Sequence, residues 1–204
     1  MTGRLGWQMT AAAMAVAALC ASGCAPKPKE FGPETHLLTP EKMSRWRLTP
    51  AYADAKPWTL TDDGVYYGHG SWVGYAELFQ HFVLECEFLF DGEGQGGIVL
   101  RGDRDSDKPW ESGYELDIDR AGDTGQGHIH FPVLPKPEPG GATFVAGVWH
   151  TVRVEAVGEQ ITVFLDGVQA IAFTDRQFIL GHICLESEEG GVRYRNLRVR
   201  PIEQ

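Results

Sequence analysis

The chain has 204 residues, of which 43% are hydrophobic and 23% charged, so it is long enough for one globular domain with a substantial core. Its formal net charge of −10 argues against nucleic acid as a partner and against docking to anionic lipid by charge alone, because both need exposed Lys and Arg. The 25 glycines and 12 prolines favour many short strands joined by turns over a few long helices.

The first residues are typical of a secretory signal peptide. Arg4 supplies a positive charge, and Ala11 to Leu19 form an apolar run that is too short to span a bilayer about 30 Å thick. The segment Ala21-Ser22-Gly23-Cys24 resembles the lipobox of bacterial lipoproteins, although Ala21 replaces the usual Leu. We therefore expect a signal peptide over 1–23, lipid on Cys24, a tether over 24–33, and export to a bacterial membrane surface with the lipid as its only anchor. An ordinary signal peptidase site is the alternative.

Two further cysteines, Cys86 and Cys184, lie in segments expected to be strands. An exported protein meets an oxidising environment, so these two cysteines are compatible with a disulfide. Two buried free thiols fit the sequence equally well, since cysteine is among the most frequently buried residues.

The strands of the first half are predicted from alternating apolar and polar residues. Val83 to Phe90 has apolar side chains at every second position, with Glu85 and Glu87 between them, as in a strand with one buried face. Further strands are expected over Ile98 to Arg101, Tyr114 to Asp119, and His128 to Phe131.

The second half contains stronger turn signals. Pro132 to Gly141 is too rich in proline for the middle of a sheet and is expected to be a surface loop, while Asp166-Gly167 is typical of a two-residue hairpin turn. The strands expected here are Trp149 to Val157, Gln160 to Leu165, Val168 to Phe173, Gly181 to Glu186, and Val192 to Arg200. About ten to twelve short strands without a convincing helix predict an all-β sandwich or jelly roll over 34–204.

Several short motifs, in their order along the chain, resemble the 3-keto-disaccharide hydrolase domain family. They span residues 34–202 and comprise YAE at 75–77 with FVLECEF at 82–88, GGIVLR at 96–101, GYELDID at 113–119, VWH at 148–150 with LDG at 165–167, GHICLE at 181–186, and RYRNL at 193–197. The resemblance implies a concanavalin/laminarinase-like jelly-roll sandwich of two curved antiparallel sheets. It also implies a hydrolase or lyase that cleaves glycosidic bonds of 3-keto-sugars.

The chemistry of such substrates indicates which side chains to look for. The ketone acidifies the hydrogen on C2, so a base can remove it, the aglycone can leave from C1, and water can add to the enone. The site then needs a base, a proton donor for the leaving oxygen, and a positive group near the enolate oxygen. The expected partner is an oxidised disaccharide or glycoside, and no cofactor or metal is expected.

One strand offers candidates for the acid–base roles. Glu115, Asp117 and Asp119 alternate along it and therefore share a face, where neighbouring carboxylates raise one another's pKa. We assign Glu115 as the base and Asp117 as a second catalytic carboxyl. His130 is the candidate acid, because histidine titrates near neutral pH, and His128 competes with it from the same face. A solvated face, or carboxylates paired with Arg, is the alternative interpretation.

Other side chains are assigned to substrate binding. Arg101 is expected either to steady the enolate or to pair with Glu115. Aromatic residues near loops stack on sugar rings, which suggests Trp110 together with Trp72 and Tyr75. The substrate-binding set is Arg101, Asp119, His128, Trp110 and Glu186.

Two other functions fit parts of the sequence. Residues 115–119 resemble the E-x-D-x-(x)-E signature of laminarinase-type retaining glycosidases, with Asp119 in place of the last Glu. Retaining chemistry needs carboxyl groups about 5–5.5 Å apart, whereas the ends of an unbulged five-residue strand lie about 13 Å apart. A non-catalytic carbohydrate-binding module with the same fold is the remaining alternative.

Overall fold

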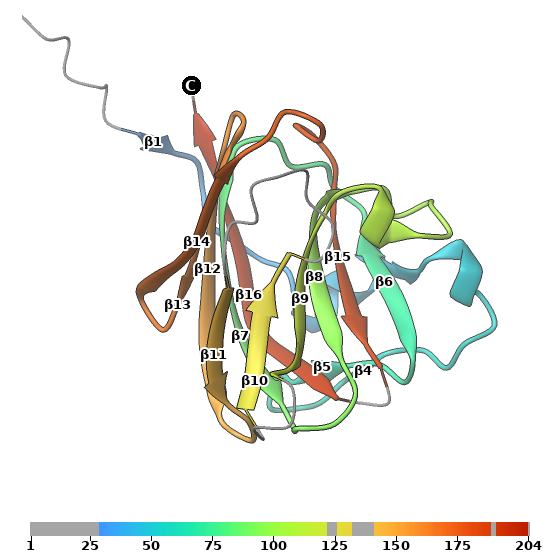
Figure 1. The fold of residues 1–204 in the computed structure, drawn as a ribbon. Coiled ribbons are helices and arrows are strands. Elements are labelled where there is room, and N and C mark those ends of the chain that lie inside the picture. Colours follow the sequence, from blue (N-terminus) through green and yellow to red (C-terminus); the bar gives the residue numbers. More distant parts are fainter. Residues whose placement is uncertain (1–28, 122–125, 132–140, 189–190, 204) are drawn as a thin grey trace, which may run out of the picture.

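The computed structural model describes residues 29–121, 126–131, 141–188 and 191–203 (Figure 1). Within these residues the chain forms two β-sheets, of nine and seven strands, in which every strand pair is antiparallel. The helices of the described residues are three short 3-10 segments, η1 (Pro40–Arg45), η2 (Pro50–Tyr52) and η3 (Pro109–Glu111). None of the described helices is long and apolar enough to cross a membrane.

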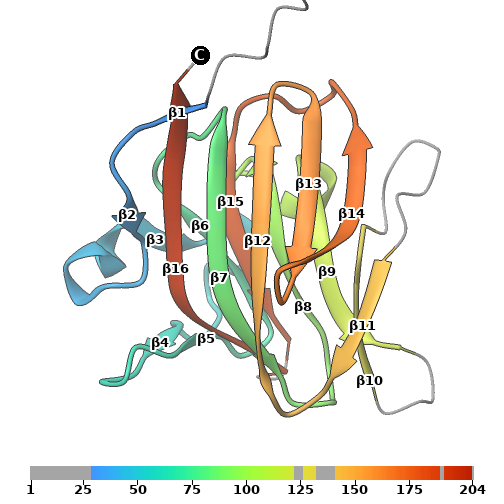
Figure 2. The same ribbon diagram turned by 90° about the vertical axis from the view of Figure 1, so that its left-hand side faces the viewer.

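The nine-stranded sheet holds the longest strands and faces the viewer in Figure 2. Its order is β14 (Val168–Thr174), β13 (Gln160–Leu165), β12 (Trp149–Val157), β7 (Phe82–Phe90), β16 (Val192–Glu203), β5 (Tyr66–Tyr67) and β4 (Thr59–Leu60), with β1 (Glu30–Phe31) and β2 (Thr35–His36) also paired to β16.

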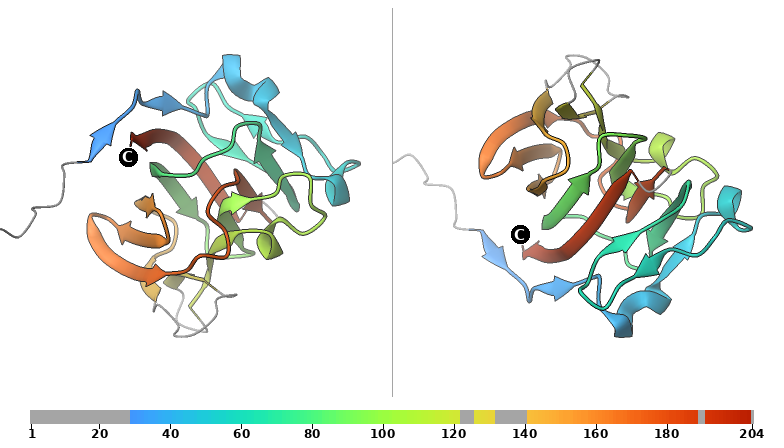
Figure 3. Two further views of the ribbon diagram at one scale, coloured as in Figure 1. Left: turned by 90° about the horizontal axis from the view of Figure 1, so that it is seen from above. Right: turned by 90° about the horizontal axis from the view of Figure 1, so that it is seen from below.

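The seven-stranded sheet forms the second layer, which the end-on views of Figure 3 show packed against the first. Its order is β11 (Gly141–Val145), β10 (Gln126–His130), β9 (Tyr114–Arg120), β8 (Gly96–Gly102), β15 (His182–Ser187), β6 (Ser71–Tyr75) and β3 (Trp46–Leu48).

The core lies between the two sheets because alternate residues of each strand point inward. On β9 the buried side chains are Tyr114, Leu116 and Ile118, which leaves the intervening acidic residues on the outer face. On β7 the alternation works in the same way, with Phe88 and Phe90 inside. The predicted all-β sandwich is thereby confirmed.

The Asp166-Gly167 hairpin signal is confirmed, and strands extend into two segments that were predicted as a tether and a loop. Asp166 and Gly167 both have positive φ, of 49° and 82°, as a tight hairpin turn between antiparallel strands requires. Pairing begins at Glu30, inside the segment predicted as a tether, because β1 lies along the end of β16. Gly141, predicted to end a loop, begins the edge strand β11.

Cys86 and Cys184 are both buried and free. Cys86 belongs to the core between the sheets, whereas Cys184 lies in a small apolar cluster with Trp72 and Val99. The seven-stranded sheet therefore separates the two thiols. The disulfide is not formed, and the alternative of two buried free thiols holds.

Candidate functional site

The outer faces of the two sheets both carry acidic side chains, but only one face neutralises them. On the nine-stranded sheet, Glu85 accepts a hydrogen bond of 2.8 Å from Arg198, and Glu87 accepts one of 2.7 Å from Arg195. On the seven-stranded sheet, the acidic side chains of β9 form no ion pair with any Lys or Arg of the described residues. Pairing with Lys or Arg is expected on a structural surface, so the acidic side chains without such a partner mark the candidate site.

Three carboxyl groups gather at the centre of this face. Asp117 on β9 and Glu186 on β15 both pair with Gly97 of β8, one from each side. The Glu115 side chain lies next to the same glycine, since a Cβ at Gly97 would be 3.3 Å from Oε1 of Glu115. One oxygen from each of the three side chains lies within 4.8 Å of the others. The acidic trio, Glu115, Asp117 and Glu186, is therefore assembled from two strands separated by a glycine.

The trio is buried without being satisfied. Glu186 is only 4% exposed, and its Oε2 has no hydrogen-bond partner. Oδ1 of Asp117 is also buried and unpartnered. Leaving a buried oxygen unpaired costs about 1–3 kcal/mol, so such groups need a reason other than stability, and a catalytic role is one such reason.

Burial and mutual repulsion keep protons on the trio. Burial, and then the charge of Asp117, raise the pKa of Glu115 to about 8. Burial, and then Asp119, raise the pKa of Asp117 to about 7, and burial, followed by Glu115, raises that of Glu186 to about 9. Near neutral pH the trio thus holds both protonated carboxyls, which can donate, and an ionised one, which can accept.

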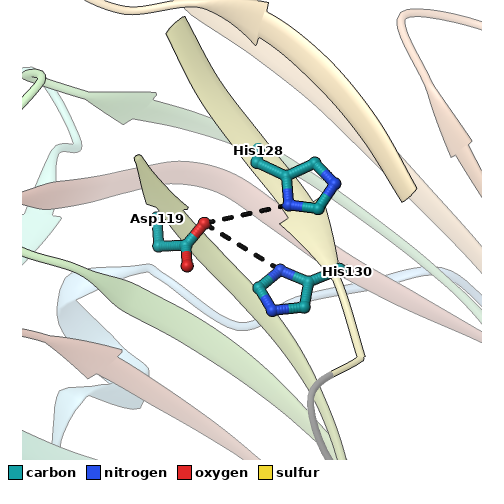
Figure 4. A group of neighbouring side chains, drawn as sticks. All are labelled: Asp119, His128 and His130. Atoms are coloured by element: carbon teal, nitrogen blue, oxygen red, sulfur yellow. Dashed lines mark ion pairs between the residues drawn. The ribbon is translucent and has the colours of Figure 1, made fainter. Parts of the chain in front are cut away.

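A second group adjoins the trio on the same face. Asp119 on β9 and the two histidines of β10 point toward one another (Figure 4). Oδ1 of Asp119 lies 4.0 Å from Nδ1 of His128 and 3.9 Å from Nδ1 of His130, which is too long for a hydrogen bond. Oδ1 of Asp119 and Nδ1 of His130 are buried and unpartnered. His130 pairs in register with Asp117, so this His/Asp cluster is contiguous with the trio.

Aromatic side chains border the trio on its other side. Trp72 of β6 is the register partner of Glu186, and it is buried beneath Trp110, with the ring centroids 5.4 Å apart. Trp110 is half-buried and packs with Tyr52 around Trp72. Trp110 and Tyr52 are therefore the aromatic groups that this edge offers to a ligand. Tyr75, the third aromatic candidate, lies in the core, because its strand position points inward.

Arg101 is not part of the site, contrary to expectation. Simple alternation would put it on the outer face with Glu115, but its φ of 55° and a register shift between β8 and β15 turn the side chain inward. It is 1% exposed and donates hydrogen bonds to the main-chain carbonyls of Gln80, Gly158 and Phe178. Its role is to hold three loops together.

A tyrosine from the opposite sheet supports the trio from below. Tyr194 of β16 is fully buried, and its hydroxyl lies 3.0 Å from the carbonyl of Gly97 and 2.7 Å from that of Glu186. Burial raises its pKa well above the usual value, so the hydroxyl remains a donor. Tyr194 thus links β8 and β15 to the nine-stranded sheet next to the acidic trio.

The structure brings together six of the residues chosen from sequence in two contiguous groups, and it moves Glu186 from the substrate-binding set into the acidic trio. The six are Glu115, Asp117 and Glu186 in the trio, and Asp119, His128 and His130 in the second group. Nδ1 of His130, the predicted acid, lies 3.9 Å from Oδ1 of Asp119. Gly97 and Tyr194 were missed, because the signal for them is cross-strand register and not residue type. Cys24 and most of the Pro132 to Gly141 loop lie outside the described residues.

Comparison with solved structures shows the fold. The chain superposes on a CBM66 carbohydrate-binding module from Bacillus subtilis with a TM-score of 0.58 and 18% identity, covering 76% of this chain and 94% of that one. A candidate glycosyl hydrolase from Parabacteroides distasonis ATCC 8503 gives a TM-score of 0.62 and 18% identity, with 83% and 100% covered. A β-glucanase from Bacillus licheniformis gives a TM-score of 0.54 and 10% identity, with 88% and 100% covered.

Comparison of sequences shows the family. No curated protein matches the chain significantly. The model of the 3-keto-alpha-glucoside-1,2-lyase-like domain matches residues 35–200, which include every strand of the seven-stranded sheet and both groups of site residues. The resemblance seen in the short motifs is confirmed, and the chain belongs to the 3-keto-alpha-glucoside-1,2-lyase-like domain family.

Proposed function

We propose that this protein cleaves the glycosidic bond of 3-keto-glucosides by proton abstraction at C2, elimination and, for net hydrolysis, hydration. The observation that carries the proposal is the acidic trio of Glu115, Asp117 and Glu186, whose buried oxygens lack partners and whose pKa values are raised into the range of about 7 to 9. Acid–base catalysts work best when their pKa lies near the operating pH.

The reaction divides into steps that the trio can serve. The base takes the proton from C2, and the electron pair of the C–H bond moves to form an enolate at the C3 oxygen. The enolate then re-forms the ketone as the C1–O bond breaks, and the departing oxygen takes a proton from a protonated carboxyl. The product is a 1,2-unsaturated 3-keto sugar, and addition of water across its double bond gives the free 3-keto sugar.

The electrostatics favour a division of roles. Asp117 has the lowest pKa of the three, about 7, and we assign it the role of the base. Glu115, beside it on β9, keeps its proton at neutral pH and donates it to the leaving oxygen. The base is therefore Asp117, and Glu115, first assigned as the base from the sequence, becomes the acid. Because the three groups are coupled, the charge belongs to the trio as a unit.

The test uses the full chain purified in mild detergent. It is incubated with methyl 3-keto-α-glucoside and 3-keto-trehalose, beside the unoxidised sugars, and products are followed by mass spectrometry. Release of the aglycone from the oxidised sugars alone supports the proposal. Deuterium uptake at C2 in D₂O, under conditions where the aglycone is poorly expelled, isolates the base step. The absence of both aglycone release and deuterium exchange at C2 would overturn the proposed function.

A carbohydrate-binding module is the second candidate. The similarity to a CBM66 module and the Trp110–Tyr52 edge favour it. Such a module would bind the sugars without turnover or C2 exchange, so the same experiment separates the two. The laminarinase-type alternative is disfavoured, because β9 pairs with β8 and β10 without a register shift, so no bulge shortens the separation of Glu115 and Asp119.

We further propose that the protein is exported and anchored by lipid on Cys24, on the sequence features of residues 1–24. Metabolic labelling with an alkyne-bearing fatty acid tests this proposal. Label is expected on the wild-type protein and not on Cys24→Ala. Equal labelling of both, or of neither, contradicts it.

A further inference from the structure

We propose that Asp119, His128 and His130 form a binding site for a divalent transition-metal ion, such as Zn²⁺ or Mn²⁺. Two imidazoles and one carboxylate are a ligand set that such ions prefer, and three protein ligands leave coordination positions open for a substrate oxygen. The role in catalysis given below rests on the proposed function, whereas the binding itself does not.

The geometry supports a shared ligand. One donor atom from each of the three side chains lies within 4.8 Å of the others, and Oδ1 of Asp119 is 3.9–4.0 Å from the two Nδ1 atoms. Ligand atoms around tetrahedral zinc lie about 3.4 Å apart, given bonds of about 2.0–2.1 Å. Small side-chain adjustments would bring the three atoms into that arrangement, and Figure 4 shows all three donors facing the same point.

The donor atoms have no competing partners. Oδ1 of Asp119 and Nδ1 of His130 are buried without a hydrogen bond, although both are strongly polar. The two imidazole rings stack with centroids 4.7 Å apart, which holds them side by side. Gly141 on β11 leaves room for the imidazole ring of His128, since a Cβ at this position would come within 2.4 Å of Nε2 of His128.

A cation here would also supply what the proposed reaction lacks. Elimination needs a positive group near the enolate oxygen, and Arg101, the side chain first considered, points into the interior. Among the described residues, no Lys or Arg forms an ion pair with Asp119 or with the trio. A metal ion on Asp119, His128 and His130 would lie beside Asp117, the register partner of His130. In that position the ion would polarise the C3 carbonyl of the substrate.

The experiment measures Zn²⁺ binding without any sugar. The full chain, without a polyhistidine tag, is stripped with chelator, dialysed against Zn²⁺, and assayed for bound metal. About one tightly bound Zn²⁺ per chain is expected, and His128→Gln and His130→Gln should each weaken its affinity by at least about 10-fold. His36→Gln, which changes an exposed histidine on β2, is the matched control and should bind as the wild type does.

Several outcomes overturn the assignment. They are absence of bound Zn²⁺ in the wild type, undiminished binding in a His128→Gln/His130→Gln double variant, and loss of binding in Glu186→Gln alone, which would place the ion in the trio. In case the variants fail to fold, long-range ¹H–¹⁵N spectra of the wild type provide a second readout. Zn²⁺ should then shift the Nδ1 resonances of His128 and His130 and leave those of His36 in place.

The result is independent of the proposed function. Zn²⁺ binding at these residues without any turnover of 3-keto-glucosides would refute the function and keep the site. Turnover that persists at full rate in the chelator-treated, metal-free protein would keep the function and refute the catalytic role of the ion.

Discussion

Asp117 and Glu186 face each other across Gly97, with one strand between them that contributes no side chain at this position. Because a glycine separates them, two carboxyl groups from β9 and β15 can approach more closely than side chains two strands apart in a sheet usually do. The arrangement makes the glycine as much a determinant of the site as the acids themselves.

Gly97→Ala should therefore damage the site more than the fold. Its Cβ would lie 3.2 Å from the carbonyl of Leu116 and 3.3 Å from Oε1 of Glu115, so the Glu115 side chain must shift. We expect turnover of 3-keto-glucosides to fall by about 10-fold or more, since misplacing a catalytic group by about 1 Å can cost 100-fold. Gly32→Ala, whose Cβ would meet only ordinary contacts near Pro201, is the control and should keep full activity.

Glu115→Gln and Asp117→Asn should each lower kcat by about 100- to 10,000-fold while sugar binding persists, because each removes a proton acceptor or donor and keeps its shape. Steady-state kinetics and calorimetric binding check this. Glu87→Gln is the matched control, as the same change on the outer face of the other sheet, where Glu87 pairs with Arg195. An undiminished kcat in both site variants would contradict the assigned roles.

The free energy of unfolding should fall as pH rises from about 7 to about 9. The carboxyls of Glu115 and Glu186 ionise near pH 4 when unfolded, but at about 8 and about 9 in the folded protein. In this window the unfolded state therefore binds fewer protons, so each such carboxyl lowers stability by up to about 1.4 kcal/mol per pH unit until its folded pKa is passed. Urea titrations at several pH values measure the slope, and Glu186→Gln should flatten it.

Arg101→Met should destabilise the protein by about 2–4 kcal/mol, because it leaves the carbonyls of Gln80, Gly158 and Phe178 without their buried donor. Denaturant unfolding measures the loss. If Arg101 instead stabilised the enolate, Arg101→Met would abolish turnover with little change in stability. We expect Arg101→Met to lose stability and to retain measurable turnover at low temperature.

The thiols of Cys86 and Cys184 should be insensitive to redox conditions. Both are buried and burial raises the pKa of each, to about 12 for Cys184, so little thiolate forms near neutral pH. Native alkylation followed by peptide mass spectrometry should leave both unmodified, and alkylation in denaturant should modify both. Protection of either cysteine in denaturant, lifted only by reductant, would reveal a disulfide.

The sequence predicted the strands from Phe82 onward, apart from β11, because the alternation of β7, β9 and β12 follows from which side chains face the core. It did not predict β1 to β6, most of which are only two or three residues long and too short to show an alternating pattern. The same alternation placed Glu115 and Asp117 on one face. It failed for Arg101, since a left-handed residue in an irregular stretch inverts the parity that the pattern assumes. It also could not pair His130 with Asp119 in preference to Glu115, because register between strands depends on the whole sheet and not on either strand alone.

Tyr194 gives the site an unusual relation to the rest of the molecule. Its hydroxyl reaches from one sheet to the backbone of Gly97 and Glu186 in the other, directly beneath the trio. Local opening of β8 or β15 would have to break this contact, so the backbone amides around the trio should exchange with solvent only when the two sheets separate. The carboxyl groups of the trio are then held by backbone that both sheets stabilise, so opening of one strand alone should not dissolve the site.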